Sequence, residues 1–331
     1  MKFLKANLLL LSILLLIASI CAIAGSYWII NHQPGLIPKP LLEVVRDAKI
    51  TDNPKSETCS ECHQVIFDAW KKSRHSKAWV SEFYIKDSED RSKEKCLPCH
   101  IPAVVNPGSK PEPRLDHRDE GIFCAPCHLK DGEIRGPYDL LAPPHPTRQV
   151  ADYRKALFCG SCHETTYKEW KETGEEDSCQ SCHMPSSLGR LTQKLPLNLL
   201  HKKRKVADHS FPHGEFSEKD IDIKIEFKGR GVVLTLQNLT VPHHLPTADN
   251  GDPRLFVYSD FFDSKGETLD SFKEIVSPQL KTALPFKEQV RYHYFVSNAS
   301  AATVRVEYKP AWSKENQLVF SRSFPEDGSN G

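Results

Sequence analysis

The hydrophobic and polar positions divide the chain into three stretches. Residues 6–30 form an uncharged run rich in Leu and Ile. A bilayer-spanning helix needs about 20 apolar residues, so this run is long enough to cross a membrane. Residues 56–214 contain few long apolar stretches, whereas apolar and polar positions alternate from residue 221 onward. The pattern predicts a membrane anchor or signal peptide at 1–30, a linker at 31–55, one domain at 56–215 and another at 216–331.

The first segment predicts that the body of the protein is exported. Lys2 and Lys5 precede the apolar run, and such a positive flank stays on the cytoplasmic side. An Ala-x-Ala sequence ending at Ala24 resembles a signal-peptidase site. The run nevertheless continues with Tyr27 and Trp28, which favours a retained transmembrane helix. We expect the domains on the periplasmic or extracellular side of the cytoplasmic membrane.

The second domain is predicted from alternation with a period of two residues. The pattern predicts strands at four places, which are 221–227, 232–236, 290–294 and 304–306. Short strands separated by Gly, Asn, Asp and Pro are typical of a β-sandwich, here of roughly 110 residues.

Two further segments connect the parts. Pro34, Pro38 and Pro40 predict an extended linker that lifts the body off the membrane. The basic cluster from His201 to Lys205 could dock a negatively charged partner or neutralise the carboxylates of a bound group, although a solvated linker is the simpler interpretation.

The composition of the middle segment indicates an unusual core. The chain has 11 Cys, 15 His and only two Met, and the segment 56–214 is dense in Cys, His, Pro and charge. Such a segment cannot build an ordinary hydrophobic core by itself, so it needs another source of apolar mass. The net charge of +1 gives no reason to expect a nucleic-acid partner.

A motif of the form Cys-x-x-Cys-His occurs five times and uses ten of the eleven cysteines. Two thiols three positions apart on a helical turn can form thioethers to both vinyl groups of one haem, and the next residue then faces the iron. We therefore predict five covalently attached haem c groups. The attachment residues are Cys59, Cys62, Cys96, Cys99, Cys124, Cys127, Cys159, Cys162, Cys179 and Cys182, and the proximal iron ligands are His63, His100, His128, His163 and His183. Zinc sites and disulfides explain the cysteines less well, because neither requires a His after every second Cys.

An internal repeat supports this interpretation. The sequence from Cys59 to Trp70 parallels that from Cys159 to Trp170, with an aromatic residue four positions and a Trp seven positions after the motif His. This spacing follows one face of a helix, so we expect each of these motifs to run into a helix that packs on haem.

The sixth ligand of each iron is expected to be a second histidine. Met1 is the initiator, and Met184 follows His183 directly and cannot reach the far face of its own haem. Met ligation is therefore nearly excluded, and bis-histidine irons of low potential are expected. The remaining histidines are His32, His75, His117, His145, His201, His209, His213, His243, His244 and His293.

The haem region resembles the cytochrome c-554 type of multihaem cytochromes, whose relatives include octahaem tetrathionate and hydroxylamine enzymes. The resemblance covers most of residues 56–260. It rests on Trp70-Lys-Lys-Ser-Arg-His75, Glu120-Gly-Ile-Phe-Cys124-Ala-Pro-Cys-His, Phe158-Cys159-Gly-Ser-Cys-His, Cys179-Gln-Ser-Cys-His-Met184-Pro185, Asp208-His209-Ser-Phe and His243-His244-Leu-Pro246-Thr247.

The resemblance implies distal ligands as well. They are His75, His145, His209 and one of His243 or His244, and a ligand in the second domain would let that domain clamp the last haem. This chain has Pro242 and Ala248 where the related pattern has Gly, which leaves open which of the two adjacent histidines ligates. For the fifth distal ligand we prefer His117 over His213 and His201.

The expected fold is mixed: a haem-packed, mostly helical and irregular domain, then a small β-sandwich, with one N-terminal transmembrane helix. The expected function is electron transfer rather than enzymatic catalysis. The donor would be a membrane quinol dehydrogenase or another redox protein, and the acceptor an exported redox protein or reductase. The alternative is a haem oxidoreductase that acts on a small nitrogen or sulfur species at one open haem. A homo-oligomer in which a neighbouring chain supplies a distal His is a third hypothesis.

Overall fold

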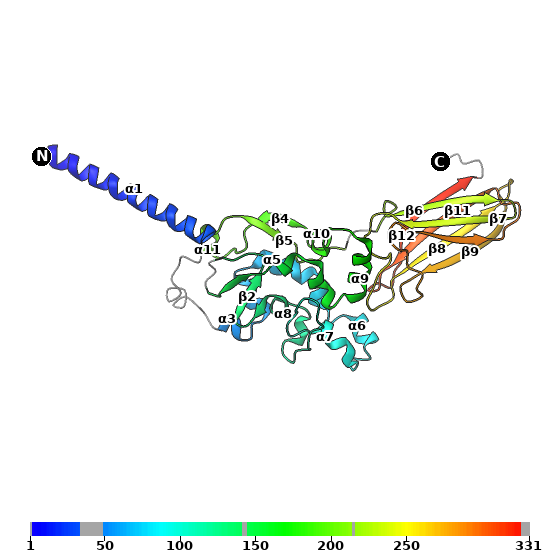
Figure 1. Ribbon diagram of the computed structural model, residues 1–331, viewed down its shortest axis with the longest axis horizontal. Helices are drawn as coiled ribbons and strands as arrows, with labels where there is room; N and C mark the ends of the chain where they lie inside the picture. Colours follow the sequence, from blue (N-terminus) through cyan, green and yellow to red (C-terminus); the bar gives the residue numbers. More distant parts are fainter. Residues whose placement is uncertain (1, 34–48, 141–143, 214–215, 326–331) are drawn as a thin grey trace. The chain divides into compact units, whose positions relative to one another are not determined.

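The computed structural model describes residues 2–33, 49–140, 144–213 and 216–325 (Figure 1). The chain forms two compact units. The first consists of Met1–Phe158 and Ser178–Pro212, and the second consists of Cys159–Asp177 and His213–Gly331.

The N-terminal helix α1 (Lys2–His32) belongs to the first unit. Its stretch Leu10–His32 has 23 residues, which is long and apolar enough to cross a membrane, and it is the one such stretch among the described residues. At about 1.5 Å per residue these 23 residues span about 35 Å, which exceeds a hydrocarbon core of about 30 Å. Signal sequences meet the same criteria of length and composition. The helix is therefore compatible with both predictions, a retained anchor and a signal peptide. Most of the predicted linker, residues 34–48, lies outside the described residues.

The rest of the first unit consists of short helices, turns and two small sheets. Its helices are α3 (Lys49–Asp52), α4 (Ser56–Ser60), α5 (Gln64–Lys72), η2 (His75–Lys77), α6 (Glu82–Asp87), η3 (Glu94–Cys96), α7 (Leu97–His100), η4 (Arg118–Glu120), α8 (Cys124–His128), η5 (Ala151–Arg154), α10 (Cys179–His183) and α11 (Leu197–Leu200), and η6 (Ala156–Ser161) crosses into the second unit. The strands β1 (Leu129–Lys130), β2 (Glu133–Gly136) and β3 (Thr147–Gln149) form one sheet, and β4 (Ser186–Gly189) pairs with β5 (Arg204–Ala207) in the other.

The first unit has a sparse hydrophobic core. Among the described residues, its buried apolar side chains are Trp70, Tyr84, Ile101, Val105, Phe123 and Ala156. Burial of apolar surface is the main favourable term in folding, so six such side chains cannot stabilise a unit of this size alone. This matches the prediction that the segment needs another source of apolar mass.

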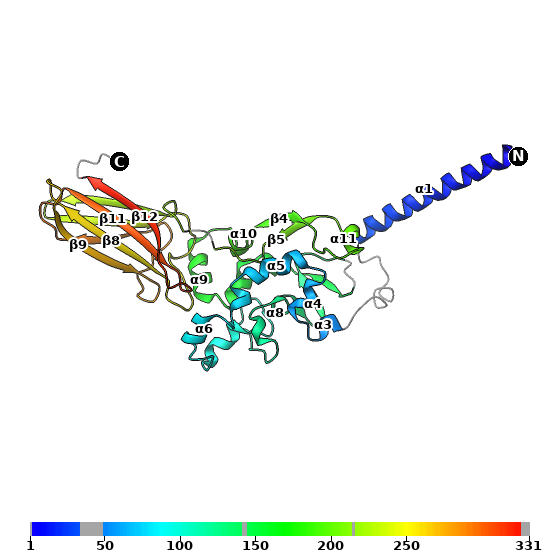
Figure 2. The ribbon, with the colours of Figure 1, turned by 180° about the vertical axis from the view of Figure 1, so that it is seen from behind.

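The second unit combines helix α9 (Glu164–Thr173) with a β-sandwich (Figures 1 and 2). One sheet has the order β10-β7-β6 and the other β12-β11-β8-β9, and all pairs are antiparallel. The strands are β6 (Ile221–Lys228), β7 (Gly231–Asn238), β8 (Arg254–Phe262), β9 (Thr268–Val276), β10 (Gln289–Tyr294), β11 (Ala301–Lys309) and β12 (Gln317–Pro325).

The two sheets share one core. Residues from both, such as Leu234 of β7 and Val257 of β8, belong to a single buried cluster. The four strands predicted from alternation correspond to β6, β7, β10 and β11. Strands β8, β9 and β12 complete the second sheet and were not predicted. In β8 every second side chain is buried, namely those of Leu255, Val257, Ser259 and Phe261. The sequence does not show this alternation clearly, because apolar residues also occur between them.

Candidate functional site

Each of the five Cys-x-x-Cys-His motifs forms a turn of helix. The third and fifth motifs lie on α8 and α10, and the second begins at the last residue of η3 and continues through α7. The first and fourth motifs begin within α4 and η6 and extend just beyond their ends. The amide N–H of His63 donates to the Cys59 carbonyl at 2.9 Å, and that of His163 donates to Cys159 at 3.0 Å. The motif residues thus have the helical arrangement that the two-thiol, one-imidazole attachment requires.

The predicted repeat has the same structure in both copies. Helix α5 follows the first motif and α9 follows the fourth. The ring centres of Phe67 and Trp70 are 5.6 Å apart, and those of Tyr167 and Trp170 are 5.8 Å apart. The helices predicted after these two motifs are therefore confirmed.

Four of the five motif histidines have a backbone carbonyl against ring nitrogen Nδ1. The distances are 2.5 Å from His63 to Leu191, 2.6 Å from His100 to Ala78, 2.7 Å from His128 to Arg135 and 3.0 Å from His183 to Pro212. A carbonyl can only accept, so Nδ1 carries the proton and Nε2 keeps its lone pair. Metal-ligating histidines usually have this arrangement, since the bond fixes both the tautomer and the ring orientation.

Burial keeps several of these imidazoles neutral. Burial, together with a smaller effect of the nearby His209, lowers the pKa of His128 to about 4. Burial likewise lowers the pKa of His145 to about 4 and lowers the pKa values of His63 and His209. A metal-bound imidazole must be neutral, so these shifts favour ligation near neutral pH.

The fourth motif has a different partner. Nδ1 of His163 lies 3.6 Å from a carboxylate oxygen of Asp249, within the second unit. Burial opposes ionisation of Asp249, but its contacts with His163 and with the amide N–H of Thr165 give it a lowered pKa. A carboxylate therefore takes the place that a carbonyl has at the other four motifs.

Two pairs of histidine rings lie at about the spacing expected for two imidazoles that would bind one iron. The ring centres of His63 and His145 are 6.2 Å apart, and those of His128 and His209 are 6.1 Å apart. A bond from a divalent metal to an imidazole nitrogen is about 2 Å long and the ring centre lies about 1 Å farther, so two imidazoles on one iron have centres about 6 Å apart. Each pair joins a predicted proximal ligand with a predicted distal one.

The first and third motifs are neighbours. The thiols of Cys59 and Cys124 are hydrogen-bonded to each other, and this contact lowers the pKa of Cys59 and raises that of Cys124. Among the described residues, those of the motifs included, no three His, Cys, Asp or Glu side chains converge as a site for a lone metal ion. The motif residues therefore fit haem c better than zinc.

The backbone of His75 contacts the segment that leads into the third motif. Its carbonyl accepts the amide N–H of Ile122 at 2.9 Å, and a Cβ at Gly121, where φ is +59°, would lie 2.5 Å from that carbonyl oxygen. Only glycine tolerates this close approach. The ring of His75 packs edge-on against the ring of Phe211, and the two ring centres are 4.2 Å apart. Phe211 follows His209 by two residues.

His117 lines a cavity of about 430 Å³ that Glu57, Trp70 and Glu120 also line. Its backbone is left-handed, with φ of 49°, and its Nε2 is buried with no hydrogen-bond partner. A buried ring nitrogen without a partner is costly, and an iron ion at this position would satisfy it.

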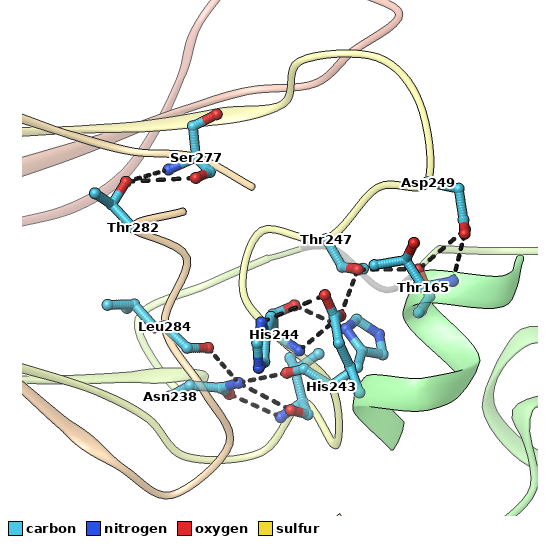
Figure 3. Close-up of polar contacts among 12 residues, drawn as sticks. Thr165, Asn238, His243, His244, Thr247, Asp249, Ser277, Thr282 and Leu284 are labelled. Carbon is cyan, nitrogen blue, oxygen red and sulfur yellow. Dashed lines mark hydrogen bonds and ion pairs between the residues drawn. The ribbon is translucent and has the colours of Figure 1, made fainter. Parts of the chain in front are cut away.

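His243 and His244 lie in a loop that is fixed to the sandwich and to α9 (Figure 3). The side-chain amide of Asn238 donates to the His243 carbonyl at 2.8 Å. On the other side, the Glu169 carboxylate of α9 accepts from Thr247 at 2.6 Å and lies 3.3 Å from Nδ1 of His244. Nδ1 of His243 lies 2.8 Å from the His244 carbonyl, so in both residues Nδ1 is the ring nitrogen beside an acceptor.

Further contacts of the same loop explain why residues 159–177 belong to the second unit with the sandwich. The amide N–H of Thr165 donates to Asp249 at 2.5 Å, and Thr166 contacts Thr247 at 2.9 Å. The loop of the second domain therefore holds the helix after the fourth motif. Sequence reasoning did not find Asp249 and Glu169, since a single acidic residue in a loop or on a helix has no distinguishing local pattern.

The family model described as cytochrome c554 and c-prime matches residues 58–129, which contain the first three motifs. This region is a multihaem cytochrome c of the c554 type. The predicted resemblance is thereby confirmed. A cytochrome c554-type region carries haem c, and its proteins transfer electrons, typically outside the cytoplasm.

The fold has a solved counterpart. The penta-heme cytochrome c552 from Thermochromatium tepidum is similar with a TM-score of 0.58 and 18% identity, over 82% of this chain and 98% of that one. Structural-genomics target SoR45 (TM-score 0.20, 12% identity, 34% of this chain and 88% of that one) and the ApaA protein from Bordetella pertussis (0.19, 8%, 32% and 90%) are too dissimilar for comparison. A comparison with curated proteins gives no match.

Proposed function

We propose that this cytochrome c554-type protein is an exported electron relay with five haem c groups and bis-histidine irons. The donor is a membrane quinol dehydrogenase or a similar redox protein, and the acceptor is an exported redox protein or reductase. The N-terminal helix would keep the relay at the cytoplasmic membrane.

The observation that carries this proposal is the facing of His63 with His145 and of His128 with His209 at about the axial-ligand spacing. An iron with two imidazoles has no position for a substrate, so it exchanges electrons only. The contact between Cys59 and Cys124 supports a short path, because it brings two attachment sites together.

When bound, haem c supplies reversible one-electron chemistry. The chain's own residues then have three tasks. The cysteines would attach the macrocycle, the carbonyls of Leu191, Ala78 and Arg135 would orient the proximal imidazoles, and the partly buried positions of His128 and His145 would limit the access of water.

The test is electron paramagnetic resonance of the full-length, haem-loaded protein. We expect five low-spin ferric haems that do not bind cyanide. His145→Ala should convert one of the five to a high-spin form that binds cyanide, whereas His293→Ala, at an exposed position on β10, should change nothing. An unchanged spectrum for His145→Ala would remove this ligand assignment.

One observation supports the alternative of a haem oxidoreductase for a small nitrogen or sulfur species. The cavity beside His117 contains two carboxylates, Glu57 and Glu120, and burial raises the pKa of Glu120. A raised carboxyl pKa suits a proton donor. A high-spin, cyanide-binding haem in the unmodified protein would favour this function over the relay.

A further inference from the structure

The end of α1 is bonded to the body of the first unit. Asn31 is 5% exposed, and its side-chain amide donates to the Leu200 carbonyl at 2.8 Å. Its side-chain oxygen accepts from the Lys202 amide N–H at 2.8 Å, and its backbone carbonyl accepts from Arg204 at 3.2 Å. The apolar span of α1 ends at His32, so a retained helix would place these partners at the membrane surface.

The segment at this junction has exposed leucines. Helix α11 lies beside the end of α1 in both views (Figures 1 and 2). Leu195 is 69% exposed and Leu199 is 65% exposed. Single exposed leucines are ordinary on a soluble surface, but here they adjoin the end of an apolar span, where an apolar side chain can enter the lipid interface.

The basic cluster follows directly. Lys203 and Lys205 are exposed, and Nζ of Lys202 lies 3.1 Å from Nε2 of His32. Lysines near a bilayer surface attract anionic headgroups. The cluster does not conflict with the orientation of α1, because basic residues govern orientation only when they are near the span in sequence, and these are about 170 residues away.

The same segment continues to the first haem motif. Nδ1 of His63 faces the Leu191 carbonyl, and the Cys62 carbonyl accepts from the Gln193 amide N–H at 2.7 Å and from the Thr192 hydroxyl at 3.0 Å. Arg190 donates to the carbonyls of Asn198 and His201. Hydrogen bonds and short stretches of backbone therefore join the end of α1 to the first motif.

We propose that Leu195–Lys205 forms a membrane dock. In this dock, Leu195 and Leu199 enter the lipid interface, Lys203 and Lys205 contact anionic phospholipid headgroups, and the first haem motif is the one held nearest the membrane. The dock rests on the part of the proposed function that keeps α1 as an anchor. It identifies where electrons from a membrane donor enter.

Spin labelling of the full-length, haem-loaded protein in lipid nanodiscs tests the dock. A Cys21→Ala background leaves one introduced cysteine as the reactive thiol, because the other ten carry haem. Nitroxide labels go on Leu199→Cys and on the control Leu318→Cys, which is 64% exposed on β12. The discs contain phosphatidylcholine with or without phosphatidylglycerol, and accessibility to oxygen is compared with accessibility to a water-soluble nickel chelate.

We expect the oxygen-to-nickel ratio to be several-fold higher at position 199 than at 318. In discs with phosphatidylglycerol, Lys203→Gln with Lys205→Gln should lower the ratio at 199, whereas the exposed control Lys265→Gln should not. If Leu199→Cys fails to load haem, Leu195→Cys takes its place.

Equal ratios at 199 and 318 would overturn the dock and leave the surface to a protein partner. Removal of residues 1–24 from the purified protein, seen by mass spectrometry, would overturn it too. Haem spectra of the same samples test the relay separately, so failure of the dock and failure of the proposed function are distinguishable.

Discussion

At the scale of single residues, the motif histidines differ in what their Nδ1 atoms meet. His63, His100, His128 and His183 meet carbonyls, whereas His163 meets the Asp249 carboxylate. A carboxylate beside this imidazole would give it more anionic character and favour ferric iron, so a haem bound at the fourth motif would have a lower reduction potential.

Asp249→Asn should therefore raise the potential of one haem of the five, by on the order of tens of mV. A spectroelectrochemical titration measures this. The control is Asp252→Asn, three residues farther on, where the carboxylate bonds to Arg254 and Ser277 instead. Equal titrations for Asp249→Asn and the unmodified protein would show that this contact does not tune the haem.

Which histidines ligate was only partly predictable at this scale. His145 and His209 were expected from the resemblance, and their rings do face His63 and His128. For His243 and His244 the structure retains the ambiguity, because each has its Nδ1 beside an acceptor. All these ligand assignments stay predictions until spectroscopy tests them.

At the scale of elements, the contact between α9 and the loop 243–249 couples the fourth motif to the sandwich. Glu169 is 9% exposed, and its carboxylate accepts from the Thr247 hydroxyl and from the His244 amide N–H at 3.2 Å. Buried donors that lose an acceptor are more costly than donors that reach water.

Glu169→Ala should lower the stability of the second unit by about 1–3 kcal/mol, because the Thr247 hydroxyl and the His244 amide N–H lose their acceptor. Calorimetry of the haem-loaded protein measures the loss as a lower melting temperature. Glu172→Ala, on the exposed side of the same helix, should have an effect within about 0.5 kcal/mol. Similar losses for both variants would contradict the coupling.

Element prediction succeeded where periodicity was strong. The alternation at 221–227 gave β6, and the spacing from His63 to Trp70 gave α5. Strand β8 was missed because Phe256, Tyr258 and Phe262 occupy its second face and conceal the alternation.

At the scale of the whole molecule, the two units have different sources of stability. The described part of the second unit buries eighteen apolar side chains, whereas that of the first buries six. We therefore expect the first unit to fold around haem, whereas the sandwich has its own core.

A chain produced without haem attachment should show this difference. We expect the sandwich strands to keep hydrogen-exchange protection and residues 56–158 to lose it, measured by mass spectrometry. Comparable protection in both units without haem would refute the claim that haem supplies the first core.

The sequence by itself determined the haem motifs, the apolar helix and four of the seven sandwich strands, because each depends on spacing within a few residues. Only the tertiary structure decided that His63 faces His145, that Asp249 meets His163, and that Asn31 joins Leu200. These contacts link positions about 80 to 170 residues apart, and no local period encodes which of several similar histidines or acids the folded chain will bring together.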